Sequence, residues 1–279
     1  MAGALKVAVT GASSGIGRAT ALELARRGHL VFAAARREEM LADLAAATPN
    51  VRAVSLDVTD LDSVRRAWAT IEAGTGGAGV DVLVNNAGFA LTGPVEVLAG
   101  ADVQRQFATN VFGLLAMTRA ALPAMRARGS GRIINLSSLV GRTTFPVMGV
   151  YGATKYAVEA LSDALRQEVA GFGIQVVIIE PGFVATGLGE SADARAGARQ
   201  DIPEGYASMV AGGARYLAAQ IAKGIRPEQV AAAIADAAEH RSPRPRYVVP
   251  PRARPLIGLL TTLPDRLADR AKQRALAAS

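Results

Sequence analysis

Short apolar runs and amphipathic stretches alternate along most of the chain. The runs have the length of buried strands, and the stretches between them repeat their apolar positions with the period of a helix. The predicted strands lie at 6–10, 30–35, 51–56, 80–84, 131–136 and 174–179, and the predicted helices at 18–25, 38–47, 60–73, 100–122, 151–170 and 227–240. Strands that are apolar throughout favour a parallel sheet buried on both faces. We therefore predict an α/β protein with a doubly wound parallel sheet and helices on both faces.

The regular alternation weakens between residues 187 and 223, where glycine and alanine are frequent. So long a connection usually has a functional role, often as a lid. The pattern resumes at helix 227–240 and at a short edge strand, 246–249. We predict a single domain over residues 1–250 with a lid-like insertion at about 187–223, followed by a basic, proline-containing extension at 251–279.

The composition is that of a globular protein, with 50% hydrophobic and 20% charged residues among 279. The chain has no cysteine and two distant histidines, His29 and His240, which excludes disulfides, thiolate nucleophiles and metal sites built from these residues. No window approaches the roughly 18 apolar residues of a membrane span, and the N-terminus lacks a secretory pattern. We expect a soluble, cytoplasmic protein without a metal.

The net charge of +7 lies entirely in the tail. Residues 1–240 carry 22 basic and 22 acidic side chains, whereas residues 241–279 carry nine basic and two acidic ones. Several prolines predict that the first half of this tail is extended over the surface, which does not suit a compact reader of nucleic acid. We expect no nucleic-acid partner.

A glycine-rich segment separates the first strand from the first helix. Its glycines let the backbone approach a pyrophosphate, and the free N–H groups of a helix N-terminus favour an anion. A tight turn is the purely structural alternative, but the position within the first β–α–β unit favours nucleotide binding. We predict a Rossmann-like cofactor site that includes Gly11, Ser13, Ser14, Gly15, Ile16 and Gly17.

Residues at the end of the second strand indicate which nicotinamide cofactor is used. An NAD site normally has an acid there, which holds the ribose 2′-hydroxyl. This chain has Ala35, Arg36 and Arg37 instead, and a guanidinium suits a 2′-phosphate. We predict NADP, with Arg36 as the main partner and Ser14 or Arg18 as helpers. The alternative is that Arg36 is a solvated charge.

Tyr151 and Lys155 lie four residues apart in a predicted helix, so their side chains share a face. A nearby cation favours the phenolate and can bring the pKa of a phenol into working range. Taken alone, such a pair would be read as surface residues. Beside other polar residues at strand ends, Tyr151 becomes a candidate acid/base.

The chemistry-bearing residues follow successive strands in a particular order. They are Thr10 to Gly17, Asp57, Asn85 to Gly88, Asn110, Ser138, Tyr151 with Lys155, and Pro181-Gly182 with Thr186. In order and spacing, this set resembles the short-chain dehydrogenase/reductase family over residues 6 to about 186. Any one motif is modest evidence, and the ordered set is highly specific.

The resemblance implies a role for each residue of a catalytic set. The hydroxyl of Tyr151 gives a proton to the substrate oxygen while the nicotinamide delivers hydride. Lys155 holds the nicotinamide ribose and lowers the pKa of Tyr151. Ser138 hydrogen-bonds the carbonyl oxygen, with Ser137 as the nearby alternative, and Asn110 positions a water that relays protons.

The resemblance also implies further contacts to the cofactor. Asp57 and Val58 contact the adenine, whereas Asn86, Ala87 and Gly88 line the adenosine and ribose. Pro181, Gly182 and Thr186 approach the carboxamide. The structural alternative for residues 85–88 is a strand-ending turn. The family resemblance further implies a homodimer or homotetramer built on helices 100–122 and 151–170.

Apolar residues dominate the predicted substrate pocket, which predicts a hydrophobic ketone or secondary alcohol as substrate. The predicted walls are Phe89, residues 139–150 with Phe145, Val147 and Met148, and Phe183 with Leu188. We expect the tail, with a basic amphipathic helix at about 264–276, to pack onto its own protein. Contact with a partner subunit or a membrane surface is the alternative.

Three functions fit these residues. The main hypothesis is an NADP-dependent carbonyl reductase. A 3-ketoacyl reductase acting on acyl carrier protein shares the motifs but usually lacks such a tail. A protein that senses NADP without turnover would need the glycines and Arg36 but has no use for an acid/base set.

Overall fold

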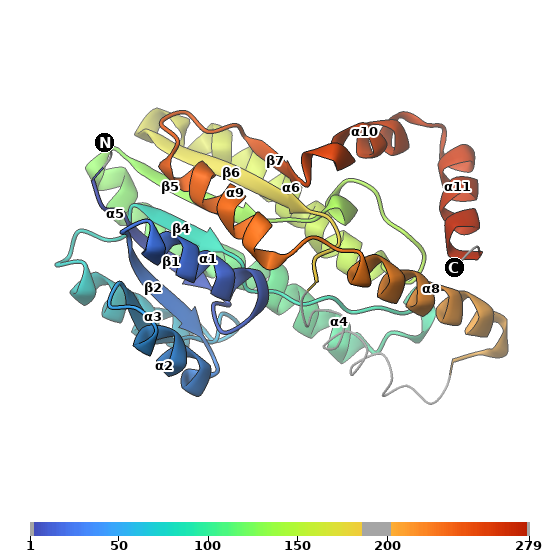
Figure 1. Cartoon of the computed structure of the whole chain (residues 1–279), viewed down its shortest axis with the longest axis horizontal. Coiled ribbons are helices and arrows are strands. Elements are labelled where there is room, and N and C mark those ends of the chain that lie inside the picture. Colours follow the sequence, from blue (N-terminus) through green and yellow to red (C-terminus); the bar gives the residue numbers. More distant parts are fainter. Residues whose placement is uncertain (1–2, 186–201, 278–279) are drawn as a thin grey trace.

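The computed structural model describes residues 3–185 and 202–277. Within these residues, parallel strands form one seven-stranded sheet in the order β3-β2-β1-β4-β5-β6-β7 (Figure 1). The strands are β1 (Lys6–Thr10), β2 (Leu30–Ala35), β3 (Val51–Ser55), β4 (Val82–Asn85), β5 (Gly131–Leu136), β6 (Ile174–Pro181) and β7 (Arg246–Val249). The predicted doubly wound, Rossmann-like fold is confirmed, including the edge strand at 246–249.

Helices cover both faces of this sheet. They are α1 (Gly15–Arg26), α2 (Glu38–Ala46), α3 (Leu61–Gly74), α4 (Gly100–Phe107), α5 (Leu114–Arg128), α6 (Gly149–Glu168), α8 (Glu204–Ala222), α9 (Pro227–Glu239), α10 (Arg254–Thr262) and α11 (Asp265–Ala277). None of the helices in the described part of the chain is long and apolar enough to cross a membrane.

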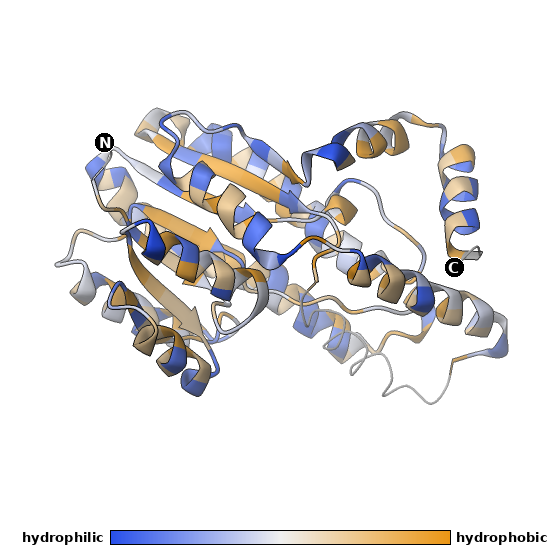
Figure 2. Ribbon diagram, viewed as in Figure 1, coloured by the Kyte–Doolittle hydropathy of each residue, from blue (hydrophilic) through white to orange (hydrophobic). Residues whose placement is uncertain are grey.

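Two apolar cores lie on opposite faces of the sheet because neighbouring strand residues point to opposite sides. Val7 and Val9 of β1 belong to a core with Ile234 of α9. Ala8, between them, belongs to a second core with Trp68 of α3. The strands are accordingly hydrophobic on both faces, while many polar residues lie on the helices (Figure 2). This double burial explains the continuous apolar runs in the sequence.

The strand order reverses direction beside β1. Because β1 pairs with β2 on one side and β4 on the other, the connections that follow these strands run to opposite faces of the sheet. Such a reversal leaves a crevice at the carboxyl ends of the strands, where ligands of this fold class bind. The glycine-rich segment and residues 86–88 both begin at this point.

The predicted helix 100–122 is interrupted. α4 ends at Phe107, a π-helical turn follows at Ala108–Gly113, and α5 continues to Arg128. Asn110 lies in this turn, where the widened backbone alters the direction of its side chain. Such π-helical turns occur frequently at functional sites.

The insertion predicted at about 187–223 contains a helix that the sequence did not predict, because Glu204–Ala222 forms α8. Residues 187–201 of that predicted insertion lie outside the described residues. Gly205, Gly212 and Gly213 weaken the local helical signal, but packing against α11 supplies tertiary contacts that propensity does not include.

The prolines predicted that the first half of the tail is extended, but part of it is helical. Residues 254–262 form α10, and Pro255 lies in its first turn, where the missing N–H costs no hydrogen bond. The second tail helix was predicted at about 264–276 and is confirmed as α11. Both tail helices lie at one end of the molecule, with α11 beside α8 (Figure 1).

Candidate active site

The glycine-rich loop between β1 and α1 needs glycine for two different reasons. Gly11 and Gly15 have φ angles of 68° and 54°, in the left-handed region that other residues rarely adopt. At Gly17, an added Cβ would lie 2.3 Å from the oxygen of Gly11 and 2.4 Å from Nδ2 of Asn86. The backbone therefore closes tightly here, leaving no room for a side chain.

Hydrogen bonds join this loop to the end of β4. The hydroxyl of Thr10 accepts from the N–H groups of Asn86 and Ala87, each at 3.0 Å. In return, Nδ2 of Asn86 donates to the oxygen of Thr10 at 2.9 Å. At Gly88, an added Cβ would come within 3.0 Å of Oδ1 of Asn110. The predicted cofactor residues after β1 and β4 thus form one connected surface.

Arg37, rather than Arg36, reaches the glycine-rich loop. Its Nη2 donates to the hydroxyls of Ser13 at 2.9 Å and Ser14 at 2.8 Å. Arg36 is exposed on the neighbouring position. The sequence predicted Arg36 as the main partner of a 2′-phosphate, and that role stays a prediction. Both arginines follow the last residue of β2, and Arg37 is the N-cap of α2, so the strand pattern alone does not separate them.

Asp57 lies after β3, where its carboxylate accepts from the N–H of Thr59 at 2.9 Å and from its hydroxyl at 2.7 Å. Burial raises the pKa of Asp57, but these hydrogen bonds and the positive charge of Arg36 outweigh it, so the pKa lies below its ordinary value. The adjacent Val58 is buried under the π-helical turn, because a Cβ at Gly113 would lie 2.6 Å from its methyl group.

Tyr151 and Lys155 are buried on one face of α6, with exposed fractions of 7% and 6%. The ammonium group of Lys155 lies 5.7 Å from the centre of the Tyr151 ring and donates to the oxygen of Leu136 at 2.8 Å. Tyr151 packs against Phe145 and Met148. The interpretation of the pair as ordinary surface residues is therefore excluded.

Burial dominates the ionisation of this pair. It raises the pKa of Tyr151 to about 12, against the opposing effect of a hydrogen bond with Ser138. It lowers the pKa of Lys155 to about 8, against the opposing charge of Glu159. The direction for Tyr151 is opposite to the one expected from the sequence, because desolvation of a phenolate outweighs the nearby cation. Tyr151 is therefore a protonated phenol at neutral pH.

Ser138, at the end of β5, is the serine that lies beside Tyr151. Its hydroxyl donates to the oxygen of Pro181 at 3.4 Å and accepts from the N–H of Val140 at 3.3 Å, and it lies close enough to Tyr151 to oppose the rise in the pKa of that phenol. The hydroxyl of Ser137 is buried without a partner among the described residues, close to Gly141. Geometry thus selects Ser138 over Ser137.

Asn110 connects the loop after β4 to α6. Its Nδ2 donates to the oxygen of Phe89 at 2.9 Å and to the hydroxyl of Thr154 at 3.1 Å, while its Oδ1 accepts from the N–H of Phe89 at 3.0 Å. Thr154 immediately precedes Lys155 in the chain. The side chain therefore ties the backbone of Phe89 to the hydroxyl of the residue before the lysine, and its role in a proton relay stays a prediction.

Pro181 and Gly182 lie at the carboxyl end of β6. The N–H of Gly182 donates to the oxygen of Val249 at 2.8 Å, and an added Cβ at Gly182 would lie 3.2 Å from a methyl group of Leu139. The oxygen of Pro181 accepts from the hydroxyl of Ser138, and the predicted contact of these residues with the carboxamide stays a prediction. Thr186 and Leu188, which the sequence also placed here, lie outside the described residues.

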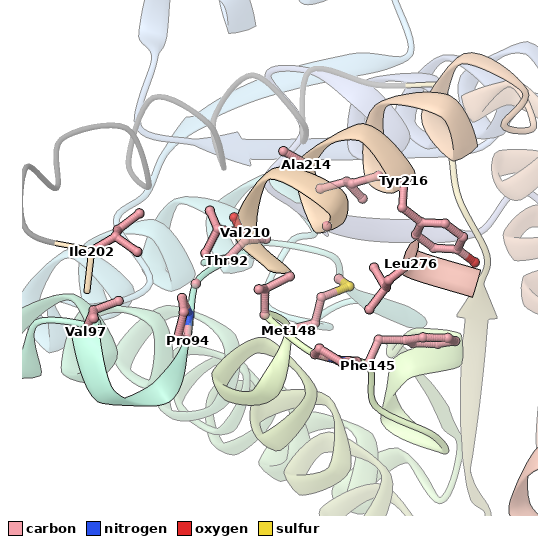
Figure 3. Close-up of a pocket in the computed structure, with 15 residues that line it drawn as sticks. Thr92, Pro94, Val97, Phe145, Met148, Ile202, Val210, Ala214, Tyr216 and Leu276 are labelled. Atoms are coloured by element: carbon pink, nitrogen blue, oxygen red, sulfur yellow. The ribbon is translucent and has the colours of Figure 1, made fainter. Parts of the chain in front are cut away.

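An apolar pocket of about 320 Å³ lies next to the cluster that contains Tyr151, because Phe145 and Met148 line the pocket (Figure 3) and also pack against that cluster. Four segments line it: residues 92–97, residues 145–148, one face of α8 with Ile202, and Leu276 of α11. Phe145, Val147 and Met148 lie in this wall as predicted, whereas Phe89 packs against Leu91 and Leu98 instead. α8 and Leu276 were missed, because nothing in the local sequence shows that they face this space.

Comparison with known proteins identifies the group to which this arrangement belongs. The family model described as short chain dehydrogenase matches residues 6–197. A 3-ketodihydrosphingosine reductase of Bacteroides thetaiotaomicron is 34% identical over 262 residues, which cover 94% of either chain. An NADPH-dependent 3-dehydrocapnine reductase of Ornithobacterium rhinotracheale is 33% identical over 270 residues, again 94% of either chain.

Solved structures agree with this relationship. A short-chain dehydrogenase from Streptomyces avermitilis superposes with a TM-score of 0.82 at 36% identity, covering 98% of both chains. A serine dehydrogenase complexed with NADP⁺ has a TM-score of 0.75 at 30% identity, covering 88% of this chain and 94% of the other. A relative from Burkholderia phymatum in complex with NAD has a TM-score of 0.80 at 27% identity, covering 92% of both chains.

The two complexes hold different nicotinamide cofactors, so the fold alone does not select between them. The family match over residues 6–197 and the similarity to reductases over nearly the whole length are decisive for the family itself. This chain is an oxidoreductase that belongs to the short-chain dehydrogenase family.

Proposed function

We propose that this protein uses NADPH to reduce the carbonyl group of a hydrophobic ketone, and oxidises the corresponding secondary alcohol in the reverse direction. The observation that carries the proposal is the buried Tyr151 with Ser138 and Lys155 near it, next to an apolar pocket that shares Phe145 and Met148 with the cluster around the tyrosine. The names of the two relatives, both reductases, support the reductive direction.

When bound, the nicotinamide cofactor would supply the hydride that the carbonyl carbon needs. Tyr151, a protonated phenol at neutral pH, gives its proton to the carbonyl oxygen. The hydroxyl of Ser138 donates a hydrogen bond to the same oxygen as negative charge develops there. The ammonium group of Lys155 would hold the ribose hydroxyls, and Asn110 keeps the hydroxyl of Thr154, the residue before Lys155, in place.

The preference for NADPH rests on the basic strand end. A guanidinium that already lies on the hydroxyls of Ser13 and Ser14 can take a phosphate oxygen in the same place. No acid occupies the position that would hold a free 2′-hydroxyl. We propose Arg37 as the main partner of the 2′-phosphate, with Arg36 adding positive charge. The relative described as NADPH-dependent supports this preference.

The alternative of a sensor without turnover is less well supported. Sensing needs the glycine-rich loop and the arginines, but gains nothing from a buried tyrosine, lysine and serine at the same strand end. Burying Lys155 in particular disfavours its charged form. A catalytic use accounts for that cost.

Oxidation of NADPH in the presence of a panel of ketones tests the proposal. We expect turnover of apolar ketones by the wild type, and a loss of activity of about 10²- to 10⁴-fold in Tyr151→Phe, with near-normal affinity for NADPH. The matched control is Tyr156→Phe on the same helix. Tyr156 is 46% exposed and donates only to the oxygen of Arg142, so this variant should keep its activity.

Two results would contradict the proposal. If Tyr151→Phe retained its activity, the proton would have to come from another group. If turnover were confined to small polar carbonyls, the substrate would not be hydrophobic.

A further inference from the structure

The apolar pocket carries no charge on the described residues that line it, and two of these residues, Thr92 and Tyr216, are polar. Its volume of about 320 Å³ is at the lower end of the range for small-molecule sites. Phe145 and Met148 belong both to its wall and to the cluster that packs on Tyr151. A group bound here would therefore be the substituent next to the reacting carbonyl.

The C-terminal helix α11 supplies one wall of this pocket. Leu276 lies among Tyr216, Met148 and Phe145 (Figure 3) and is 7% exposed. The helix that carries it is held in place along its length. Ala268 is buried, and the ammonium group of Lys272 lies 5.9 Å from the centre of the Phe145 ring. The position of Leu276 is thus defined by packing, although it is three residues from the end of the chain.

Close approach between α8 and its neighbours explains how this wall forms. At Gly212, an added Cβ would lie 3.1 Å from the oxygen of Leu276. At Gly213, it would lie 2.8 Å from a methyl group of Val147. The two adjacent glycines of α8 therefore bring α11 on one side and residues 145–148 on the other against the same helix. This tight arrangement narrows the pocket.

Val147, on the opposite wall, has a strained backbone. Its φ angle is 62°, which is a true outlier for a β-branched residue. The surroundings hold it there, because its oxygen accepts from the N–H of Gly93 at 2.7 Å and its side chain packs on Gly213. A wall maintained against strain has little freedom to move away from a larger ligand. Because this wall is fixed, the space left for a ligand depends on the size of the side chains on the other walls, such as Leu276.

We propose that the apolar pocket is the binding subsite for an uncharged alkyl substituent of the ketone, and that Leu276 is a specificity-determining residue that limits its bulk. The proposal rests on the proposed reductase function for the identity of the reacting group. It adds that the last helix of the chain, outside the matched region 6–197, selects the substrate. Ketones with a charged substituent are rejected, because the lining offers no counter-charge.

The test compares Leu276 with Leu267, which lies on the same helix but is 49% exposed. kcat/KM is measured for methyl ketones with straight, branched and cyclic alkyl groups. We expect Leu276→Ala to raise kcat/KM for the branched and cyclic ketones by about tenfold relative to the straight ones, and Leu276→Trp to lower it for all of them. Leu267→Ala and Leu267→Trp should retain the wild-type order.

A binding measurement separates this inference from the reductase function. In Tyr151→Phe with NADPH present, titration calorimetry reports the affinity for the same ketones without turnover. We expect Leu276→Ala, added to Tyr151→Phe, to change the order of these affinities. If the order of affinities changed but the wild type turned over none of the ketones, the result would support the subsite and contradict the reductase function.

The opposite result would overturn the subsite alone. Wild-type turnover of the panel, with the same order of ketones in both Leu276 variants as in both Leu267 variants, would show that Leu276 does not select the substrate. Thermal unfolding of all four variants verifies that each protein is folded, and Leu276→Met replaces any variant that is not.

Discussion

The glycine-rich loop and the apolar pocket, the two halves of the site, are held together in different ways. The loop lies between β1 and α1 and is joined to its neighbours by hydrogen bonds from backbone groups and short side chains, such as Thr10 and Asn86. The pocket gathers segments from residue 92 to residue 276 and is built mainly by apolar packing. One half depends on particular residues at particular positions, and the other on the volume enclosed.

This difference has a consequence for how each half tolerates substitution. A loop in which a single added carbon would meet backbone atoms at 2.3 Å leaves little choice of residue. A packed apolar wall accepts other apolar side chains of similar volume, and a change of volume alters the shape of the space. We expect substitutions in the loop to affect cofactor binding, and substitutions in the pocket to change the choice of ketone.

Among changes to cofactor binding, the largest effect is expected at Gly17. The methyl group of Gly17→Ala would overlap the oxygen of Gly11 and the amide of Asn86, at a cost of about 1–3 kcal/mol. We expect the affinity for NADPH to fall by about 10- to 100-fold, with a lower melting temperature. Gly171→Ala is the control, because an added Cβ there meets nothing within 4 Å. Fluorescence titration of NADPH measures the affinity. Unchanged binding by Gly17→Ala would contradict the claim that the loop tolerates substitution less well than the pocket.

A smaller effect is expected at the basic strand end. Arg37→Ala removes the guanidinium that lies on Ser13 and Ser14, and one charge-assisted hydrogen bond corresponds to about a tenfold change in affinity. We expect KM for NADPH to rise by about tenfold, with KM for NADH unchanged. Arg36→Ala should have the smaller effect. An equal or larger loss in Arg36→Ala would return the main role to Arg36.

The smallest effect is expected at Lys155, where the two halves meet. Its positive charge is lost as the pH rises through its pKa of about 8. If that charge holds the cofactor, kcat/KM for reduction falls by about twofold between pH 7 and 8 and more steeply above. In Lys155→Arg the guanidinium stays charged, so this decline should disappear from the pH profile. The same decline in Lys155→Arg would assign it to another group.

The titration of Lys155 does not lower the stability of the fold over the pH range in which kcat/KM is expected to fall. The ordinary pKa of lysine is 10.5, and the folded value is about 8. Between these values the unfolded state binds more protons than the folded state, so the contribution of Lys155 to stability increases with pH. The melting temperature measured across this window therefore separates the loss of a charge at the site from a loss of structure.

The sequence by itself determined the fold and the residues along the strand ends. Apolar runs of strand length, glycines after β1 and the spacing of Tyr151 and Lys155 are local patterns, and a parallel sheet brings the carboxyl ends of its strands to one edge. Ser138, Tyr151 and Lys155 therefore meet where their positions in the chain predicted. The need for glycine at position 17 could also be predicted from the sequence, because the strand ends and the helix begins within a few residues of it.

Only the tertiary structure decided how these residues behave and what surrounds them. Burial, which depends on the whole fold, raised the pKa of Tyr151 where the neighbouring lysine alone predicted a decrease. The fold also brought the guanidinium of Arg37 onto the hydroxyls of Ser13 and Ser14. Helix α8 is stabilised by packing against α11, although its glycines have a low helix propensity. Leu276, more than 50 residues further along the chain than α8, lines the same pocket as α8. Contacts between segments so distant leave no periodic signal along the sequence.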